Sequence, residues 1–121
     1  MEKPFALIIE DDPKLGSIFV AALGQAGYET ALDADGNRFL TLLGDKTPTL
    51  ILLDLHLPYA SGAEILAQIR ADSRLAKIPI IIATADLYLA RDFQGQVDHI
   101  LLKPISMARL INIATHLKAD A

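Results

Sequence analysis

The chain has 121 residues, of which 52% are hydrophobic and 21% charged, and it contains no cysteine. This length fits a single domain, 1–121, whose core needs no disulfide, and the lack of cysteine excludes thiolate zinc sites and cysteine nucleophiles. The formal charge of −4, from 11 Lys and Arg against 15 Asp and Glu, has the wrong sign for a surface that covers phosphate backbone, so we expect no direct binding to nucleic acid.

Short apolar runs predict five strands, at residues 5–9, 28–32, 50–53, 78–83 and 100–102. The first, third and fourth runs are apolar on both alternating faces, which is typical of strands buried on both sides in a parallel sheet. The second run includes Glu29 and Thr30, which places it at an edge. The first run is too short for a signal peptide, and no uncharged apolar run approaches the roughly 20 residues that span a bilayer. We therefore expect a cytoplasmic protein with no membrane partner.

The first predicted helix begins after the first strand. Its apolar residues have the i, i+3, i+4, i+7, i+8 spacing of one buried helix face. Asp12 and Pro13 supply an N-cap and a first-turn proline, and Gly27 stands where a C-cap glycine is expected. The residues expected to face inward are Leu15, Ile18, Phe19, Ala22 and Leu23.

Four further helices are predicted, at residues 35–43, 61–71, 86–93 and from 106 onward. Ser61 and Glu64 have the spacing of a capping box, and Asp86 is the expected N-cap of the fourth helix. The side chains expected to face inward are Ile65, Leu66 and Ile69 in the third helix and Met107, Leu110, Ile111, Ala114 and Leu117 in the last.

Strands and helices therefore alternate along the whole chain, with short connections between them. Such alternation requires right-handed crossovers and a parallel sheet that helices cover on both faces. The sequence predicts a doubly wound α/β fold with five parallel strands.

Polar side chains follow the strands at their carboxyl ends, which is where ligands bind in sheets of this kind. They comprise several acids, one hydroxyl and one ammonium group. An oxygen-only cluster without His or Cys suits a hard cation such as Mg²⁺. Glu10, Asp11 and Asp12 follow the first strand, Asp54 the third and Lys103 the fifth, and Thr84 ends the fourth.

Asp54 is the natural nucleophile of this group because it stands alone at the end of the central strand. A carboxylate can accept a phosphoryl group as an acyl phosphate. That transfer needs positioning and charge neutralisation, which a metal, Lys103 and Thr84 can supply. Asp12 has two readings: an N-cap, which is favoured because it precedes Pro13, or a direct metal ligand.

The chain resembles the receiver domain of two-component response regulators, because it has four of that family's short motifs in the family's order. The resemblance covers nearly the whole chain and implies a CheY-like, flavodoxin-like sheet with the strand order 2-1-3-4-5. The motifs are Ile8-Ile9-Glu10-Asp11-Asp12, Leu52-Leu53-Asp54-Leu55-His56-Leu57-Pro58 with Gly62, Ala83-Thr84-Ala85, and Lys103-Pro104.

The resemblance implies a Mg²⁺ site and a phosphoacceptor. Asp54 would take the phosphoryl group from the phosphohistidine of a histidine kinase or a histidine phosphotransfer protein. Asp11 would bind Mg²⁺ directly, Glu10 through a water molecule, and Asp54 and the main-chain carbonyl of His56 would complete the protein ligands. The domain would catalyse only its own modification and slow dephosphorylation, so it is not expected to be an enzyme.

The resemblance also implies how the phosphorylated state is read. Thr84 would move toward the phosphoryl group, and Lys103, joined to Pro104 by a cis peptide bond, would pair with a phosphoryl oxygen. A downstream effector protein, or an output domain outside this chain, would respond to the changed population. His56 and Asp86 flank the path of an attacking water, and we hypothesise that they modulate the lifetime of the acyl phosphate.

The chain departs from the family pattern in places. Ile100 occupies the position three residues before the lysine where the family usually has Tyr or Phe, so we expect loop and helix shifts rather than an aromatic rotamer to carry the signal. The fourth helix is expected to be short, because the span from Thr84 to Lys103 is short. Whether Tyr88, Leu89 and Phe93 form an exposed patch for a partner or a homodimer, or are packed, stays open.

Other functions remain as alternatives. A receiver-like interaction module that works without phosphorylation is the main one, and Ile100 favours it mildly. An aspartyl-phosphate hydrolase of the haloacid-dehalogenase type is disfavoured, because it needs a second Asp where this chain has His56. The chain is either a free-standing regulator or a piece of a longer protein.

Overall fold

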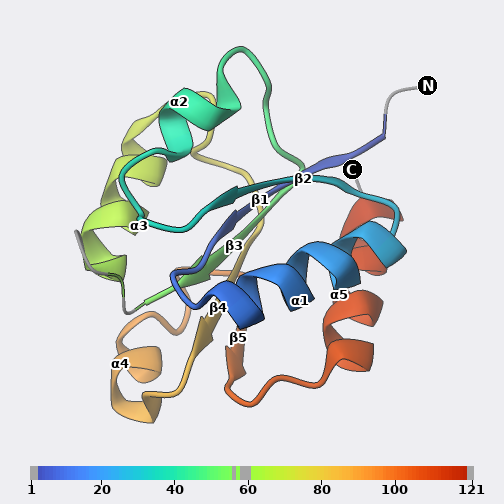
Figure 1. Cartoon of the computed structure of the whole chain (residues 1–121). Coiled ribbons are helices and arrows are strands. Elements are labelled where there is room, and N and C mark those ends of the chain that lie inside the picture. The colour runs from blue at the N-terminus through green and yellow to red at the C-terminus, as the bar shows by residue number, and fades with distance from the viewer. Residues whose placement is uncertain (1–2, 56, 58–60, 120–121) are drawn as a thin grey trace.

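A computed structural model describes residues 3–55, 57 and 61–119 of the chain (Figure 1). Strands and helices alternate throughout, as predicted. The elements are β1 (Phe5–Ile9), α1 (Pro13–Gln25), β2 (Glu29–Asp33), α2 (Phe39–Leu43), β3 (Leu50–Asp54), α3 (Gly62–Ala71), β4 (Ile80–Thr84), α4 (Leu87–Asp92), β5 (His99–Leu102) and α5 (Met107–Ala119). In the described part of the chain, every helix is too short or too polar to cross a membrane.

The five strands form one parallel sheet in the order β2-β1-β3-β4-β5. The predicted doubly wound fold and its strand order are confirmed. Strands β1, β3 and β4 lie inside the sheet, and β3 and β4 are buried along their whole length. This agrees with the continuous apolar runs that predicted them, because an inner strand of such a sheet meets helices on both faces. The second strand is at an edge, as its polar residues indicated.

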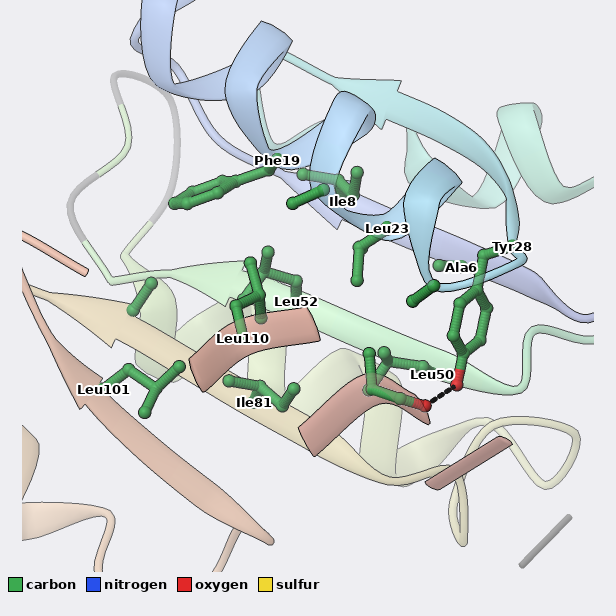
Figure 2. Close-up of a cluster of buried hydrophobic side chains, with 14 residues drawn as sticks. Ala6, Ile8, Phe19, Leu23, Tyr28, Leu50, Leu52, Ile81, Leu101 and Leu110 are labelled. Carbon is green, nitrogen blue, oxygen red and sulfur yellow. Dashed lines mark hydrogen bonds between the residues drawn. The ribbon is translucent and has the colours of Figure 1, made fainter. Parts of the chain in front are cut away.

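Helices cover the two faces unequally. In Figure 1, α1 and α5 lie on one side of the sheet and α2, α3 and α4 on the other. We call these the α1/α5 face and the α2/α3/α4 face. Figure 2 shows the apolar cluster under the α1/α5 face, where Phe19 and Leu23 from α1 and Leu110 from α5 pack on the sheet. The cluster on the other face includes Phe39 and Ile65.

Helix α1 begins as predicted but buries a narrower face. The Asp12 carboxylate caps it, and Gly27, just past its end, has a φ of 97°, which favours glycine. The prediction that Ile18 faces inward is wrong, because its side chain is 43% exposed. Ile18 lies at the margin of the apolar stripe, whose centre is formed by Phe19 and Leu23. The inward residues predicted for α3 and α5 are buried or partly buried against the two clusters.

Some predicted boundaries move for local reasons. Helix α2 begins at Phe39 rather than at residue 35, because the side chain of Asp33 binds the main-chain N–H groups of the preceding loop. Strand β4 begins at Ile80 rather than at residue 78, just after Pro79, which has no N–H group for the sheet. Asp86 caps α4 as predicted, and α4 is short, with six residues.

Tyr88, Leu89 and Phe93 do not form one exposed patch. Tyr88 is 79% exposed, Leu89 is partly buried, and Phe93 is buried in the cluster of the α2/α3/α4 face. Only Tyr88 of the three is therefore accessible as a large side chain. The question that the sequence left open is answered differently for each residue.

Candidate functional site

The carboxyl edge of the sheet brings the predicted polar residues together. Glu10 follows β1, Asp54 and Thr84 end β3 and β4, and Lys103 follows β5. The Glu10 side chain is 1% exposed, that of Asp54 3%, and that of Thr84 0%. Buried carboxylates are costly unless they are paired or hydrogen-bonded, so this edge is built around the interactions that compensate them.

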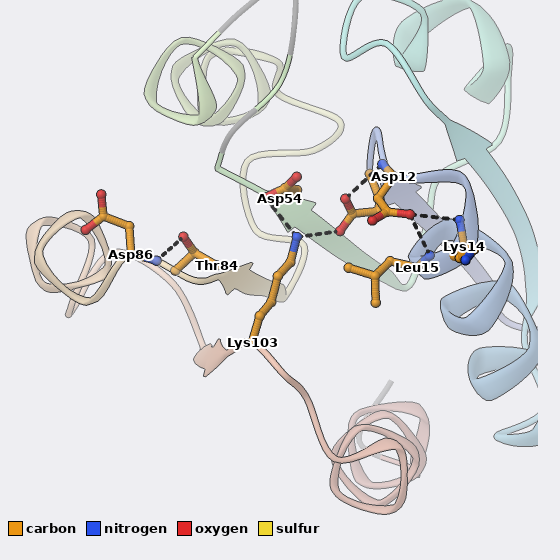
Figure 3. Close-up of polar contacts among 8 residues, drawn as sticks. Asp12, Lys14, Leu15, Asp54, Thr84, Asp86 and Lys103 are labelled. Atoms are coloured by element: carbon orange, nitrogen blue, oxygen red, sulfur yellow. Dashed lines mark hydrogen bonds and ion pairs between the residues drawn. The ribbon is translucent and has the colours of Figure 1, made fainter.

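Lys103 supplies the compensating positive charge. Its Nζ atom lies 3.0 Å from Glu10 Oε1 and 3.5 Å from Asp54 Oδ1 (Figure 3). The Lys103 main-chain N–H donates to the Thr84 carbonyl at 2.8 Å, which fixes the start of the side chain at the end of β4. One ammonium group thus bridges two carboxylates that come from different strands.

The environment shifts the pKa values of two of these groups. Burial raises the pKa of the Glu10 carboxyl to about 7; the nearby Asp54 charge also raises it, while the contact with Lys103 and the N–H of Asp12 lower it. Burial lowers the pKa of Lys103, but its interactions with Glu10 and Asp54 outweigh burial and raise it. Lys103 therefore stays protonated, whereas the charged form of the Glu10 carboxyl is disfavoured by its burial.

Glu10, Asp11 and Asp54 each offer a carboxylate oxygen within 4.8 Å of the others. Asp11 is exposed, so the group opens to solvent on one side. Glu10 Oε1 is buried and has Lys103 Nζ, at 3.0 Å, as its ion-pair partner. Carboxylate oxygens are the ligands that a hard cation such as Mg²⁺ prefers. The residues present therefore fit such an ion.

Of the two roles predicted for Asp12, N-cap or direct metal ligand, the structure shows the N-cap. Its Oδ1 accepts from the main-chain N–H of Lys14 at 2.9 Å and of Leu15 at 3.3 Å, which is an N-cap (Figure 3). Its own N–H donates to Glu10 Oε2 at 3.2 Å. Asp12 therefore serves the site through its main chain, by holding Glu10, while its side chain begins α1.

Thr84 is joined to the start of α4. Its Oγ1 accepts from the Asp86 N–H at 3.1 Å, and Asp86 Oδ1 accepts from the Leu89 N–H at 3.0 Å. The hydroxyl group is therefore held in place in this state and is coupled to the first turn of α4. Ile100 is partly buried and packs on the cluster of the α2/α3/α4 face.

Two further sequence predictions concern positions near this edge. The peptide bond between Lys103 and Pro104 is cis, as the resemblance implied. His56 lies outside the described residues, so its predicted carbonyl ligand stays a prediction. The sequence did not single out Asp33, a buried acid at the end of β2. Its only signal was an acidic residue directly after an edge strand.

Comparisons with known proteins address the family. The family model described as the response regulator receiver domain matches residues 6–115, which is most of the chain. The chain belongs to the response regulator receiver family. The recognition made from the four motifs is therefore confirmed.

The relatives of this receiver domain differ in length. DivK of Brucella anthropi, a polar-differentiation response regulator, is 33% identical over 118 residues, which cover 95% of this chain and 96% of DivK. MtrA of Mycolicibacterium smegmatis, a DNA-binding response regulator, is 30% identical over 105 residues. Those residues cover 87% of this chain and 46% of MtrA, so the chain spans about half the length of several relatives it matches.

Solved structures agree with the family. The receiver domain of the sensor histidine kinase PA1611 from Pseudomonas aeruginosa, solved with a magnesium ion in its active-site cleft, is 29% identical with a TM-score of 0.86, covering 98% of this chain and 99% of that one. The CheY4 chemotaxis protein of Vibrio cholerae, at 21% identity and a TM-score of 0.85, covers 96% of this chain and 99% of its own. CheY4 supports the fold alone.

Proposed function

We propose that Asp54 is the phosphoacceptor of this receiver domain and takes a phosphoryl group from a phosphohistidine. The observation that carries the proposal is the buried ion pair in which Lys103 Nζ joins Asp54 to Glu10 at the carboxyl edge of the sheet. Asp54 ends the central strand β3, so it lies between the acids that follow β1 and the lysine that follows β5. The donor is a histidine kinase or a histidine phosphotransfer protein.

The transfer is a displacement at phosphorus. A carboxylate oxygen of Asp54 attacks the phosphorus atom, the P–N bond to the donor imidazole breaks, and the imidazole leaves with the bonding electron pair. Asp54 then carries an acyl phosphate. Lys103, whose raised pKa keeps it protonated, moves its positive charge from the Glu10 and Asp54 carboxylates toward a phosphoryl oxygen.

Glu10, Asp11 and Asp54 are the residues that would hold Mg²⁺, together with the main-chain carbonyl of His56. When bound, the ion supplies charge neutralisation on the phosphoryl oxygens. Burial raises the pKa of Glu10, and a cation bound beside it would lower that pKa and so favour the charged carboxylate. Asp12 keeps Glu10 in place through its main-chain N–H.

Thr84 is the residue that reads the new charge. Its hydroxyl oxygen accepts from the Asp86 N–H at the start of α4, and as its O–H moves to donate to a phosphoryl oxygen on Asp54, that contact with Asp86 shifts. Phosphorylation therefore acts first on α4, and Ile100 follows by packing rather than by turning an aromatic ring. The effector is a partner protein or an output domain outside this chain, so the domain signals by protein contact and performs no further catalysis.

The experiment that tests this proposal is chemical. The chain is incubated with Mg²⁺ and phosphoramidate, a small phosphodonor, and its intact mass is measured. We expect the mass of one phosphoryl group to be gained, and lost again in hydroxylamine. Asp54→Asn should gain nothing, whereas Asp45→Asn, which removes the same charge at an exposed position, should behave as the unchanged chain.

Other outcomes point to other functions. No adduct from phosphoramidate or from a phosphohistidine protein would favour an interaction module that works without phosphorylation. Multiple turnover on a phosphate ester would favour a hydrolase. Both results would overturn the proposal, because it requires one stable phosphoryl group on one side chain.

The lifetime of the acyl phosphate is a separate proposal. Asp86 is partly buried beside Thr84, and His56 is two residues after the acceptor. We propose that this polar pair modulates attack by water on the acyl phosphate. Decay measured by phosphate release should change in His56→Ala and in Asp86→Ala, and equal decay in all three proteins would contradict the idea.

A further inference from the structure

Asp33 is a buried acid outside the cluster described above. It ends β2, its side chain is 1% exposed, and no described cation forms an ion pair with it. Its carboxylate accepts three main-chain hydrogen bonds instead: Oδ1 from the N–H of Asp35 and of Gly36, each at 2.9 Å, and Oδ2 from the N–H of Arg38 at 2.8 Å. Three such bonds compensate a buried carboxylate. The Asp33 side chain is therefore built into the loop 34–38.

The main chain of Asp33 contacts the site directly. Asp33 pairs with Ile9 in the parallel register of β2 and β1, and its carbonyl accepts from the Glu10 N–H at 3.1 Å. Glu10 is the buried acid that contacts Lys103. One residue thus joins the first acid of the site to the loop that follows β2.

The far side of the loop touches the segment that follows the phosphoacceptor. Gly36 is buried with a φ of 84°, and a Cβ atom placed on it would lie 3.0 Å from Leu57 Cδ1 and 3.1 Å from Ile65 Cδ1. Leu57 is three residues after Asp54, and Ile65 belongs to α3. The loop 34–38 therefore packs against Leu57, beyond the end of β3, and against α3.

We propose that Asp33 is a positioning residue for the phosphoryl site, although it touches none of the reacting groups. Its three hydrogen bonds hold the loop 34–38 against Leu57, and its carbonyl holds the start of the Glu10 segment. Glu10, directly after β1, and Leu57, three residues after Asp54, are thereby held by the same loop. This inference rests on the proposed function of Asp54 but concerns a different side chain.

The test uses two substitutions that remove different numbers of hydrogen bonds. Asp33→Asn can keep an oxygen toward the Asp35 and Gly36 N–H groups but turns an NH₂ toward Arg38, whereas Asp33→Ala keeps none. We expect the Mg²⁺ dissociation constant to rise roughly tenfold in Asp33→Ala and less in Asp33→Asn, in the range of outer residues around metal ligands. The rate of phosphoramidate adduct formation at saturating Mg²⁺ should fall in the same order.

A control separates positioning from general stability. Tyr28→Phe removes a buried hydrogen bond under the α1/α5 face, away from the site. All variants are compared at a temperature where thermal melts show them folded. Tyr28→Phe should keep the Mg²⁺ affinity and the adduct rate. Equal values for Asp33→Ala and the unchanged chain would overturn the inference.

The proposed route through Leu57 has its own test. Leu57→Ala removes the contact of the loop while leaving the hydrogen bonds of Asp33 in place. In the double variant with Asp33→Asn, the two effects on Mg²⁺ affinity should be less than additive, because both weaken the packing of the loop against Leu57. Full additivity would contradict the route, and this pair of variants also decides the question if Asp33→Ala does not fold.

Failure of the proposed function is recognised separately. If the unchanged chain takes no phosphoryl group, the role of Asp54 fails. Hydrogen exchange of the peptide containing Leu57 then still tests the packing of the loop against Leu57, because it needs neither metal nor phosphate. Exchange should be faster in Asp33→Ala than in Tyr28→Phe, and equal exchange would reject this role of Asp33.

Discussion

The two faces of the sheet are built in different ways. On the α1/α5 face, both helices have 13 residues. Tyr28 Oη donates to the Ala114 carbonyl of α5 at 2.7 Å (Figure 2), and Lys118 Nζ of α5 donates to the Ala26 carbonyl, at the end of α1, at 2.7 Å. On the α2/α3/α4 face, α2 has five residues and α4 six. Those two short helices expose Leu40, Leu42, Leu87 and Tyr88.

The difference indicates that the α1/α5 face contributes most to stability, whereas the short helices of the α2/α3/α4 face move more easily. Local opening costs least where few buried apolar groups hold an element, so α2 and α4 are the parts that can move without unfolding the sheet. Thr84 is linked to α4 through Asp86, and the loop before α2 packs against Leu57, beyond the end of β3. The site is therefore coupled to both short helices, while on the α1/α5 face Asp12 joins it to the first turn of α1.

The largest effect is expected for a core substitution on the α1/α5 face. Phe19 is fully buried in its cluster, and Phe19→Ala should lower the free energy of unfolding by about 3–5 kcal/mol, because it removes a large apolar group and leaves a cavity. Urea denaturation measures this. Ile18→Ala, at the exposed neighbour, should change it by less than about 0.5 kcal/mol. Similar losses at both positions would mean that α1 packs differently.

The second prediction compares the helices directly. Amide exchange at the centres of α1 and α5 should need nearly global unfolding, whereas exchange in α2 and α4 should occur through local opening, with protection lower by roughly tenfold or more. Hydrogen exchange followed by NMR resolves the individual amides. Equal protection of α4 and α5 would remove the proposed division between the two faces.

The third prediction concerns the tie at Tyr28. Tyr28→Phe removes the hydrogen bond to the Ala114 carbonyl and should cost about 1 kcal/mol of unfolding free energy at neutral pH. Mg²⁺ binding should not change. A loss of Mg²⁺ affinity in this variant would show that the α1/α5 face does communicate with the site.

The same variant gives a pH dependence with a defined sign. Burial raises the pKa of Tyr28 from 10.0 to about 12, so the unfolded chain ionises this phenol at a lower pH than the folded chain. The stability that Tyr28 contributes is therefore complete below pH 10 and is lost as the pH rises from 10 toward 12. The difference between the unchanged chain and Tyr28→Phe should shrink over that range, and a constant difference would contradict the shift.

Much of the fold could be predicted from the sequence, because buried strands and helix faces produce regular patterns of apolar residues. Strands β3 and β4, buried throughout, gave continuous apolar runs, and the caps Asp12, Ser61 and Asp86 marked where helices begin. The start of α2 was not readable in this way. It depends on Asp33, whose carboxylate engages N–H groups up to five residues away and so keeps the loop out of a helix.

The sequence predicted which residues form the site but not which of them form ion pairs. Glu10, Asp54, Thr84 and Lys103 stand at strand ends, and the sheet order alone brings them to one edge. The contact of Lys103 with both Glu10 and Asp54 depends on side-chain length and burial, which residue spacing does not encode. The packing of the loop after Asp33 against Leu57 joins segments far apart in sequence, so no local pattern predicts it.

The smallest effect is expected on α4 itself. Leu87 is 46% exposed in the first turn of this helix, so Leu87→Ala should change the free energy of unfolding by less than about 0.5 kcal/mol in urea denaturation. Ala90→Gly, at the buried position of the same helix, should cost more, roughly 1 kcal/mol of helix propensity. A large loss of unfolding free energy in Leu87→Ala would mean that the Leu87 side chain makes stabilising contacts in solution despite its exposure. The α2/α3/α4 face would then be the more rigid of the two.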